Sequence, residues 1–148
     1  MTAQYLEDYA VGQIYWSGRT RVDKEEMIAF AKKFDPQFYH LDEVAALNSP
    51  FKGLAASGWH TAAVAMRLLV DGGLPFAHGL VGLGGEIAWP RPTRPGDTLR
   101  VESEIVEIKP SRSKPHQGIV TVRSTMLNQG GEAVYLLTAR LLVLRRSL

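Results

Sequence analysis

An aspartate and a histidine five residues apart are the first candidates for chemistry in this sequence. Asp35 and His40 lie in the segment Phe34–Asp42, which we expect to be an irregular loop between two helices. A carboxylate and an imidazole in such a loop can converge on one water molecule, which suits general acid–base chemistry near neutral pH. Structural roles fit the same residues: Asp35 as a helix end, His40 as a hydrogen-bond partner of the backbone, and Asp42 as a helix N-cap.

The second candidate is the stretch Leu54–His60, where small residues lead into an apolar segment. We expect Gly58 to open a buried helix, and free N–H groups at a helix N-terminus can donate to an oxygen that gains negative charge. A glycine there also lets a ligand approach the backbone closely. The alternative is that Ser57 is only the N-cap and Gly58 only a tight-packing residue, and a capping role for Ser57 fits both interpretations.

Other chemistries are limited by the composition. The chain contains no cysteine, which excludes disulfides, thiolate nucleophiles and cysteine-ligated metal centres. None of its four histidines lies in a metal-ligand pattern such as HExxH, so we expect no metal site. Arg91 and Arg94 lie in the proline-rich turn Pro90–Asp97, where their guanidinium groups are candidates for phosphate contacts. Alternatively, both arginines are charged residues of the turn that only face solvent.

Two helices are expected around the candidate loop. Asp23 can cap the first helix, whose apolar residues recur at helical spacing. That helix must end near Asp35, because Pro36 disfavours helical geometry in the residue before it. Asp42 can cap a second, short helix over residues 43–47.

The remainder of the chain combines one apolar segment with several strands. Residues 59–71 are apolar nearly all the way round, which predicts a helix that is buried on every side and ends at Gly72 and Gly73. Strands are expected over residues 13–22, 80–89, 98–108, 118–128 and 132–145. The pair Gly130–Gly131 predicts a hairpin between the last two.

A core helix followed by a long antiparallel meander has few packing solutions, because the sheet must wrap the helix to bury it. This arrangement is the hotdog fold, an α+β architecture, and we expect residues 1–148 to form a single domain of this kind. A sheet of this size also has edge strands to hide. We therefore expect a homodimer or a higher homo-oligomer.

The composition is that of an ordinary soluble protein. Of the 148 residues, 45% are hydrophobic and 22% are charged, which excludes a disordered chain. The net charge of +2 comes from scattered basic residues and does not indicate nucleic-acid binding. The N-terminus lacks the features of a targeting signal, and no apolar stretch is long enough to span a membrane. We expect a cytoplasmic protein without nucleic-acid or membrane partners.

With these elements in order, the sequence resembles the MaoC-like dehydratases, the family of (R)-specific enoyl-CoA hydratases. The family pattern Asp-x-Asn-Pro-x-His precedes a short helix and a small-residue stretch that ends in glycine. Asp35 and His40 match its aspartate and histidine, and Gly58 falls where the family places its backbone oxyanion donor. Gln37 and Phe38 stand where the family has asparagine and proline.

The resemblance implies a reversible syn addition of water to a trans-2-enoyl-CoA, giving an (R)-3-hydroxyacyl-CoA, as in fatty acid metabolism. Asp35 and His40 would be catalytic, and Gly58 would bind the thioester oxygen. With such a substrate, Arg91 and Arg94 are the candidates for contacts with the phosphates of coenzyme A. No cofactor is implied, because coenzyme A is part of the substrate. The alternatives are a hotdog thioesterase and a non-catalytic acyl-thioester-binding subunit. The lack of a carboxylate in residues 59–70 argues against the first, and the Asp35–His40 pair against the second.

Overall fold

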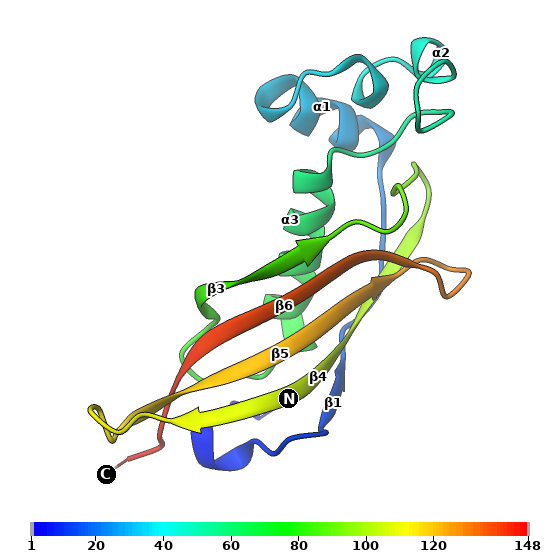
Figure 1. The fold of residues 1–148 in the computed structure, drawn as a ribbon. Helices are drawn as coiled ribbons and strands as arrows, with labels where there is room; N and C mark the ends of the chain where they lie inside the picture. Colours follow the sequence, from blue (N-terminus) through cyan, green and yellow to red (C-terminus); the bar gives the residue numbers. More distant parts are fainter. Residues whose placement is uncertain (1, 148) are drawn as a thin grey trace.

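The computed structural model describes residues 2–147 and shows an antiparallel sheet curved around one helix, with α1 and α2 at one end of the molecule (Figure 1). The strands are β1 Ile14–Trp16, β2 Thr20–Arg21, β3 Val81–Ala88, β4 Thr98–Pro110, β5 Gln117–Leu127 and β6 Ala133–Leu144. They lie in the order β1-β4-β5-β6-β3, and β2 also pairs with β4. The predicted hotdog fold is confirmed, and so is the hairpin between the last two strands.

The helical elements are η1 Leu6–Asp8, α1 Lys24–Phe34, η2 Phe38–His40, α2 Glu43–Ala46, α3 Gly58–Leu68 and η3 Leu69–Gly73. The two predicted caps are present: Asp23 accepts a hydrogen bond from Glu26 N at 3.1 Å, and Asp42 accepts from two N–H groups of α2. α1 ends two residues before Pro36, as expected. Within residues 2–147, no helix has the length and apolar character that crossing a membrane requires.

The core lies between α3 and the inward face of the central strands. Alternate residues of β4 and β5 point inward, so Leu99, Val101, Val120 and Val122 are each no more than 1% exposed. Leu69, which follows α3 directly, is equally buried in the same cluster. This packing fixes α3 against the sheet and holds the start of the helix, where Gly58 lies, in a defined place.

The predicted strand over residues 13–22 is interrupted, which corrects the sequence interpretation. Ser17 lies between β1 and β2, and its Oγ accepts a hydrogen bond from Val101 N at 2.7 Å. Its own N–H donates to Val101 O at 2.9 Å. Because a side-chain oxygen takes the place of a backbone carbonyl at this point, the ladder with β4 is broken into two short pieces.

The prediction that the central helix is buried on every side is wrong. Trp59 and Met66 of α3 are 59% and 44% exposed, and all eight residues of β3 are exposed. β3 is the edge strand beyond β6. Met66 faces β3 across an apolar cavity of about 340 Å³ that Gly84 and Ile87 also line. The sheet of one chain therefore covers only part of α3 and leaves an apolar face beside its own edge.

Candidate active site

Asp35 is the residue at which α1 ends. Its N–H still donates to Ala31 O at 2.8 Å, but its φ of −153° and ψ of 65° leave the helical region. Its side chain is 17% exposed. The change of direction before Pro36 brings the carboxylate to the start of α3 instead of to solvent, and the contacts described next follow from it.

His40 lies in η2, and its side chain is 5% exposed. Its Nδ1 lies 2.7 Å from Ala55 O, and its Nε2 lies 3.3 Å from Asp35 Oδ2. The Nδ1 contact is a hydrogen bond to an acceptor, and the Nε2 contact is an ion pair with Asp35 when the imidazole is protonated. Because the backbone carbonyl holds the Nδ1 proton, Nε2 is the nitrogen that can exchange a proton with a ligand.

Ser57 is the N-cap of α3 and connects this helix to Asp35 at the end of α1. Its Oγ donates to Asp35 Oδ2 at 2.7 Å and accepts from Trp59 N at 3.3 Å, and the residue is fully buried. The predicted cap is therefore present, but sequence reasoning missed the bond to Asp35. Ser57 and Asp35 are 22 residues apart, and only the packing of α1 against α3 brings them together. The sequence signal that could have indicated this bond was a polar capping residue at the start of an otherwise apolar helix.

The environment of Asp35 favours its ionised form. Burial raises the pKa of this carboxyl, but hydrogen bonds from Gln37 and Ser57 and the charge of His40 lower it, and the net effect holds the pKa below its ordinary value. The Gln37 contact is short, with Nε2 2.5 Å from Asp35 Oδ1. The carboxylate is therefore in its proton-accepting form at neutral pH, and the lowered pKa makes it a weaker base than a free carboxylate.

Gly58 is the first residue of α3, so its N–H has no acceptor within the helix. The indole of Trp89 packs against it: Trp89 Nε1 donates to Gly58 O at 2.8 Å, and a Cβ at this position would lie 2.9 Å from Trp89 Cε2. The tight-packing role that was the alternative interpretation of this glycine is therefore present. It leaves the N–H free, so both roles are compatible.

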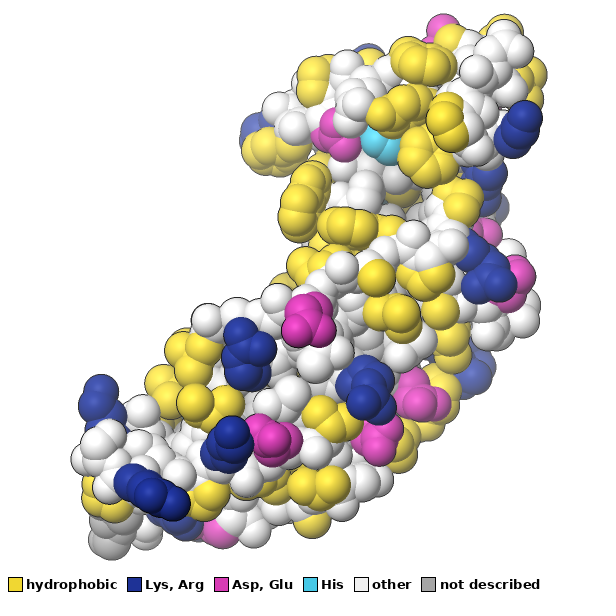
Figure 2. Space-filling view, in the orientation of Figure 1, with side chains coloured by type: hydrophobic (Ala, Val, Ile, Leu, Met, Phe, Trp, Pro, Cys, Tyr) yellow, Lys and Arg dark blue, Asp and Glu magenta, His cyan; other side chains and the backbone are white. Residues whose placement is uncertain are grey.

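His40 and Gly58 line the same cavity, which has a volume of about 480 Å³. Gln37, Trp89 and Arg91 also contribute to its walls. In the space-filling view, the surface between the helical end of the molecule and the sheet is hollowed, and hydrophobic side chains border the hollow (Figure 2). The cavity thus combines an apolar rim with polar atoms from three separate segments of the chain.

The two arginines of the proline-rich turn have different surroundings. Arg91 lines the cavity, and its Nε lies 3.2 Å from Glu132 Oε2 at the surface. Arg94 donates from Nη1 to Leu54 O at 3.1 Å and from Nη2 to Phe51 O. Arg94 therefore braces the loop that leads into α3. The phosphate contact expected of each arginine stays a prediction.

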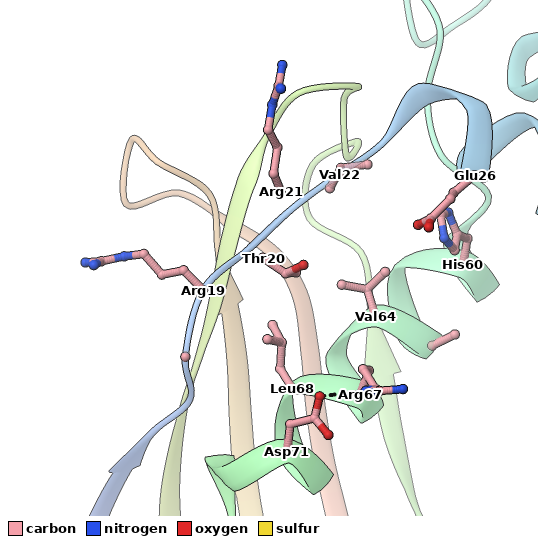
Figure 3. Close-up of a pocket in the computed structure, with 12 residues that line it drawn as sticks. Arg19, Thr20, Arg21, Val22, Glu26, His60, Val64, Arg67, Leu68 and Asp71 are labelled. Atoms are coloured by element: carbon pink, nitrogen blue, oxygen red, sulfur yellow. Dashed lines mark hydrogen bonds and ion pairs between the residues drawn. The ribbon is translucent and has the colours of Figure 1, made fainter.

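A second cavity, of about 420 Å³, lies between the β2 segment and α3 (Figure 3). His60 lines it, and burial lowers the pKa of this histidine, although Glu26 nearby acts in the opposite sense. Figure 3 shows Arg19 and Arg21 directed away from α3. The cavity contains none of the predicted site residues. Among residues 2–147, no group of three or more His, Asp or Glu side chains is placed to hold a metal ion.

The fold and the site together define a hotdog-fold protein that carries a carboxylate–imidazole pair at the N-terminus of its central helix. The family model of the MaoC like domain matches residues 10–127 of this chain. The chain therefore belongs to the MaoC-like family, a family that includes hydratases, and the resemblance noted in the sequence is confirmed.

The chain is similar to several known proteins, over very different lengths. A crystal structure of the MaoC-like dehydratase from Rhodospirillum rubrum is 55% identical, with a TM-score of 0.97 over 99% of this chain and 100% of that one. The unliganded R-hydratase PhaJ1 from Pseudomonas aeruginosa is 26% identical, with a TM-score of 0.74 over 97% of this chain and 88% of that one. Mesaconyl-CoA hydratase from Cereibacter sphaeroides is 50% identical over 46 residues, which are 31% of this chain and 13% of that protein.

Proposed function

We propose that this protein catalyses the reversible syn addition of water to a trans-2-enoyl-CoA, giving an (R)-3-hydroxyacyl-CoA. One observation carries the proposal: His40 and Gly58 line one cavity, and the ionised carboxylate of Asp35 lies 3.3 Å from the imidazole. Membership of the MaoC-like family and the similarity to an R-hydratase support the reaction class.

Asp35 and His40 divide the proton transfers between them. Asp35 accepts a proton from water while the water oxygen forms its bond to C3 of the substrate. His40 delivers its Nε2 proton to C2, which receives the electron pair of the double bond. Asp35 is then protonated and His40 neutral. Because their atoms are 3.3 Å apart, one proton transfer restores the starting pair. The reverse sequence removes water.

The Gly58 N–H supplies the electrostatic part of the mechanism. As C3 is attacked, negative charge develops on the thioester oxygen, and a backbone donor at the start of α3 stabilises it together with the helix dipole. Trp89 keeps its indole against Gly58, which excludes a side chain at this position and holds the peptide in place.

The substrate requires no separate cofactor in this proposal, because coenzyme A is part of the thioester. Arg91 is the arginine placed to contact its phosphates, since it lines the catalytic cavity and is about half exposed. The acyl group is left open by the residues themselves. The match to a protein named mesaconyl-CoA hydratase makes a branched dicarboxylic acyl group one candidate.

We also propose that a second copy of the chain covers β3 and the exposed side of α3. Val81, Leu83 and Ile87 of β3 are between 42% and 53% exposed, and Trp59 and Met66 lie on α3. An unpaired, apolar edge strand is a surface that proteins normally cover. A homodimer through this edge would bury it. The expected cytoplasmic location stays a prediction.

The experiment that tests the proposed reaction follows the ultraviolet absorbance of the enoyl thioester after mixing with the purified protein. Crotonyl-CoA, longer straight-chain enoyl-CoA thioesters and mesaconyl-CoA form the panel, and free thiol is assayed in parallel. We expect loss of the enoyl chromophore with at least one thioester, no release of thiol, and an (R)-3-hydroxyacyl product. Thiol release would instead support a thioesterase, and inactivity across the panel would support a binding subunit.

A further inference from the structure

A chain of two hydrogen bonds leads from Tyr39 to the carboxylate of Asp35. The hydroxyl of Tyr39 donates to Gln37 Oε1 at 2.5 Å, and Gln37 Nε2 donates to Asp35 Oδ1 at 2.5 Å. Gln37 and Tyr39 both line the catalytic cavity beside His40. These two hydrogen bonds end at Oδ1 of the carboxylate, whereas Ser57 binds the other oxygen, Oδ2.

The carboxylate of Asp35 can only accept, so it fixes which end of the Gln37 amide meets it, and the hydroxyl of Tyr39 holds the other end. A glutamine amide has an acceptor at one end and a donor at the other, and the two ends have nearly the same shape. The ionised carboxylate takes the Nε2 donor, and Oε1 is left to accept the hydroxyl proton of Tyr39. The opposite orientation would place Oε1 against an ionised oxygen and repel it.

We propose that Tyr39 and Gln37 are positioning residues that fix the Asp35 carboxylate for its role as base. This inference rests on the proposed hydration reaction. Asp35 Oδ2 already accepts a hydrogen bond from Ser57 and lies beside His40, whereas Oδ1 has Gln37 as its donor. An ionised carboxylate oxygen has about two acceptor positions, so Oδ1 keeps one for the substrate water. The Gln37 bond sets the direction of that position.

The ring of Tyr39 is held separately from its hydroxyl. It packs edge-on against His40, with ring centroids 4.7 Å apart, and against Phe51, with centroids 5.0 Å apart. Its backbone carbonyl accepts a hydrogen bond from Ala55 N at 3.1 Å. Replacing Tyr39 by phenylalanine therefore keeps the packing and the backbone contact and removes only the hydroxyl that anchors Gln37 Oε1.

This chain of hydrogen bonds also favours the ionised form of Asp35. The titratable group that faces this carboxylate is His40 of η2, while α3 contributes the uncharged Ser57, and Gln37 adds a neutral donor from the loop between α1 and η2. The Gln37 bond is one of the causes that lower the pKa of Asp35. Weakening it therefore raises the pKa of this carboxyl, which a residue that only packs against its neighbours would not do.

The test titrates Asp35 by carbon NMR in the ligand-free protein, beside pH profiles of hydration. We expect Gln37→Met to raise the pKa of Asp35 by about one pH unit, because a donor to the charged form is lost. Tyr39→Phe should raise it by about half of that, and should lower kcat several-fold with KM nearly unchanged. The matched control is Tyr15→Phe, which removes a hydroxyl bonded to the glutamines Gln4 and Gln13 away from the site and should change neither.

A double substitution separates this inference from a simple packing effect. In a Gln37→Met background, Tyr39→Phe should leave the pKa of Asp35 where Gln37→Met alone puts it, because Tyr39 acts through Gln37. An unchanged titration in Y39F, or an equal shift in the Q37M background, overturns the inference. The NMR readout does not need turnover. If the titration of Asp35 shifts as expected but the protein is inactive on every thioester, the inference about Tyr39 and Gln37 is supported and the proposed function is rejected.

Discussion

Removing the Ser57 hydroxyl should lower stability by an amount that depends on pH. Ser57→Ala removes the N-cap of α3, which typically stabilises a helix by about 1 kcal/mol. It also removes a donor to the ionised Asp35, and hydrogen bonds to charged groups contribute roughly 1.5–3 kcal/mol. At neutral pH, we therefore expect S57A to lower the free energy of unfolding by about 2.5–4 kcal/mol.

The sign of the pH dependence follows from the pKa of Asp35. That pKa is lower in the folded protein than the ordinary 3.8, so its stabilising effect is present above that value and is lost as pH falls through the folded pKa. The bond that Ser57 makes belongs to this effect. The difference between the native protein and S57A should shrink toward the capping contribution alone, about 1 kcal/mol, as the pH falls through the folded pKa of Asp35.

The assay is urea unfolding followed by circular dichroism at several pH values. Ser49→Ala is the matched control, because the buried Ser49 Oγ also donates to one oxygen and accepts from one N–H, but the oxygen is the neutral carbonyl of Ala46. S49A should therefore destabilise by an amount that does not change with pH. If S57A shows the same pH-independent loss as S49A, the assigned bond between Ser57 and ionised Asp35 is refuted.

Three further predictions concern the helix start, the loop before it and the sheet edge. Gly58→Ala should lower kcat/KM about 100-fold with little change in far-UV circular dichroism, because its Cβ would meet Trp89 at 2.9 Å and disturb the oxyanion donor; an active G58A would contradict this. Arg94→Met should lower the free energy of unfolding by roughly 1–3 kcal/mol in urea titrations, because two backbone carbonyls lose their donor, and a stable R94M would be the contrary result. Leu83→Lys, at a position 53% exposed on β3, should give a monomer in sedimentation velocity where the native protein is a dimer; a dimeric L83K would place the interface elsewhere.

The local elements could be predicted because their signals are local. Asp23 and Pro36 mark the two ends of α1, and both act through neighbours in the sequence. Alternation of residues such as Leu99 and Val101 indicated the buried face of β4. The position of Asp35 beside His40 was within reach for the same reason, because five residues separate them and a short turn brings them together.

The remaining features depend on contacts between distant segments. Ser57 reaches Asp35 only once α1 lies against α3, and Arg94 reaches the carbonyl of Leu54 40 residues away. The break at Ser17 arises because its hydroxyl competes for Val101 across the sheet. The exposure of Met66 could not be predicted from hydrophobicity, since an apolar pattern does not say which chain covers it.

The most direct test of the central claim compares the rates of Asp35→Asn, His40→Ala and the double variant on the best enoyl-CoA thioester. Because both groups act in one proton-transfer step, we expect each single variant to be at least about 100-fold slower than the native protein. The double variant should be little slower than the worse single one, since groups that act as a unit are not additive. Native-like hydration in either single variant would contradict the account and place the reaction outside the Asp35–His40 pair.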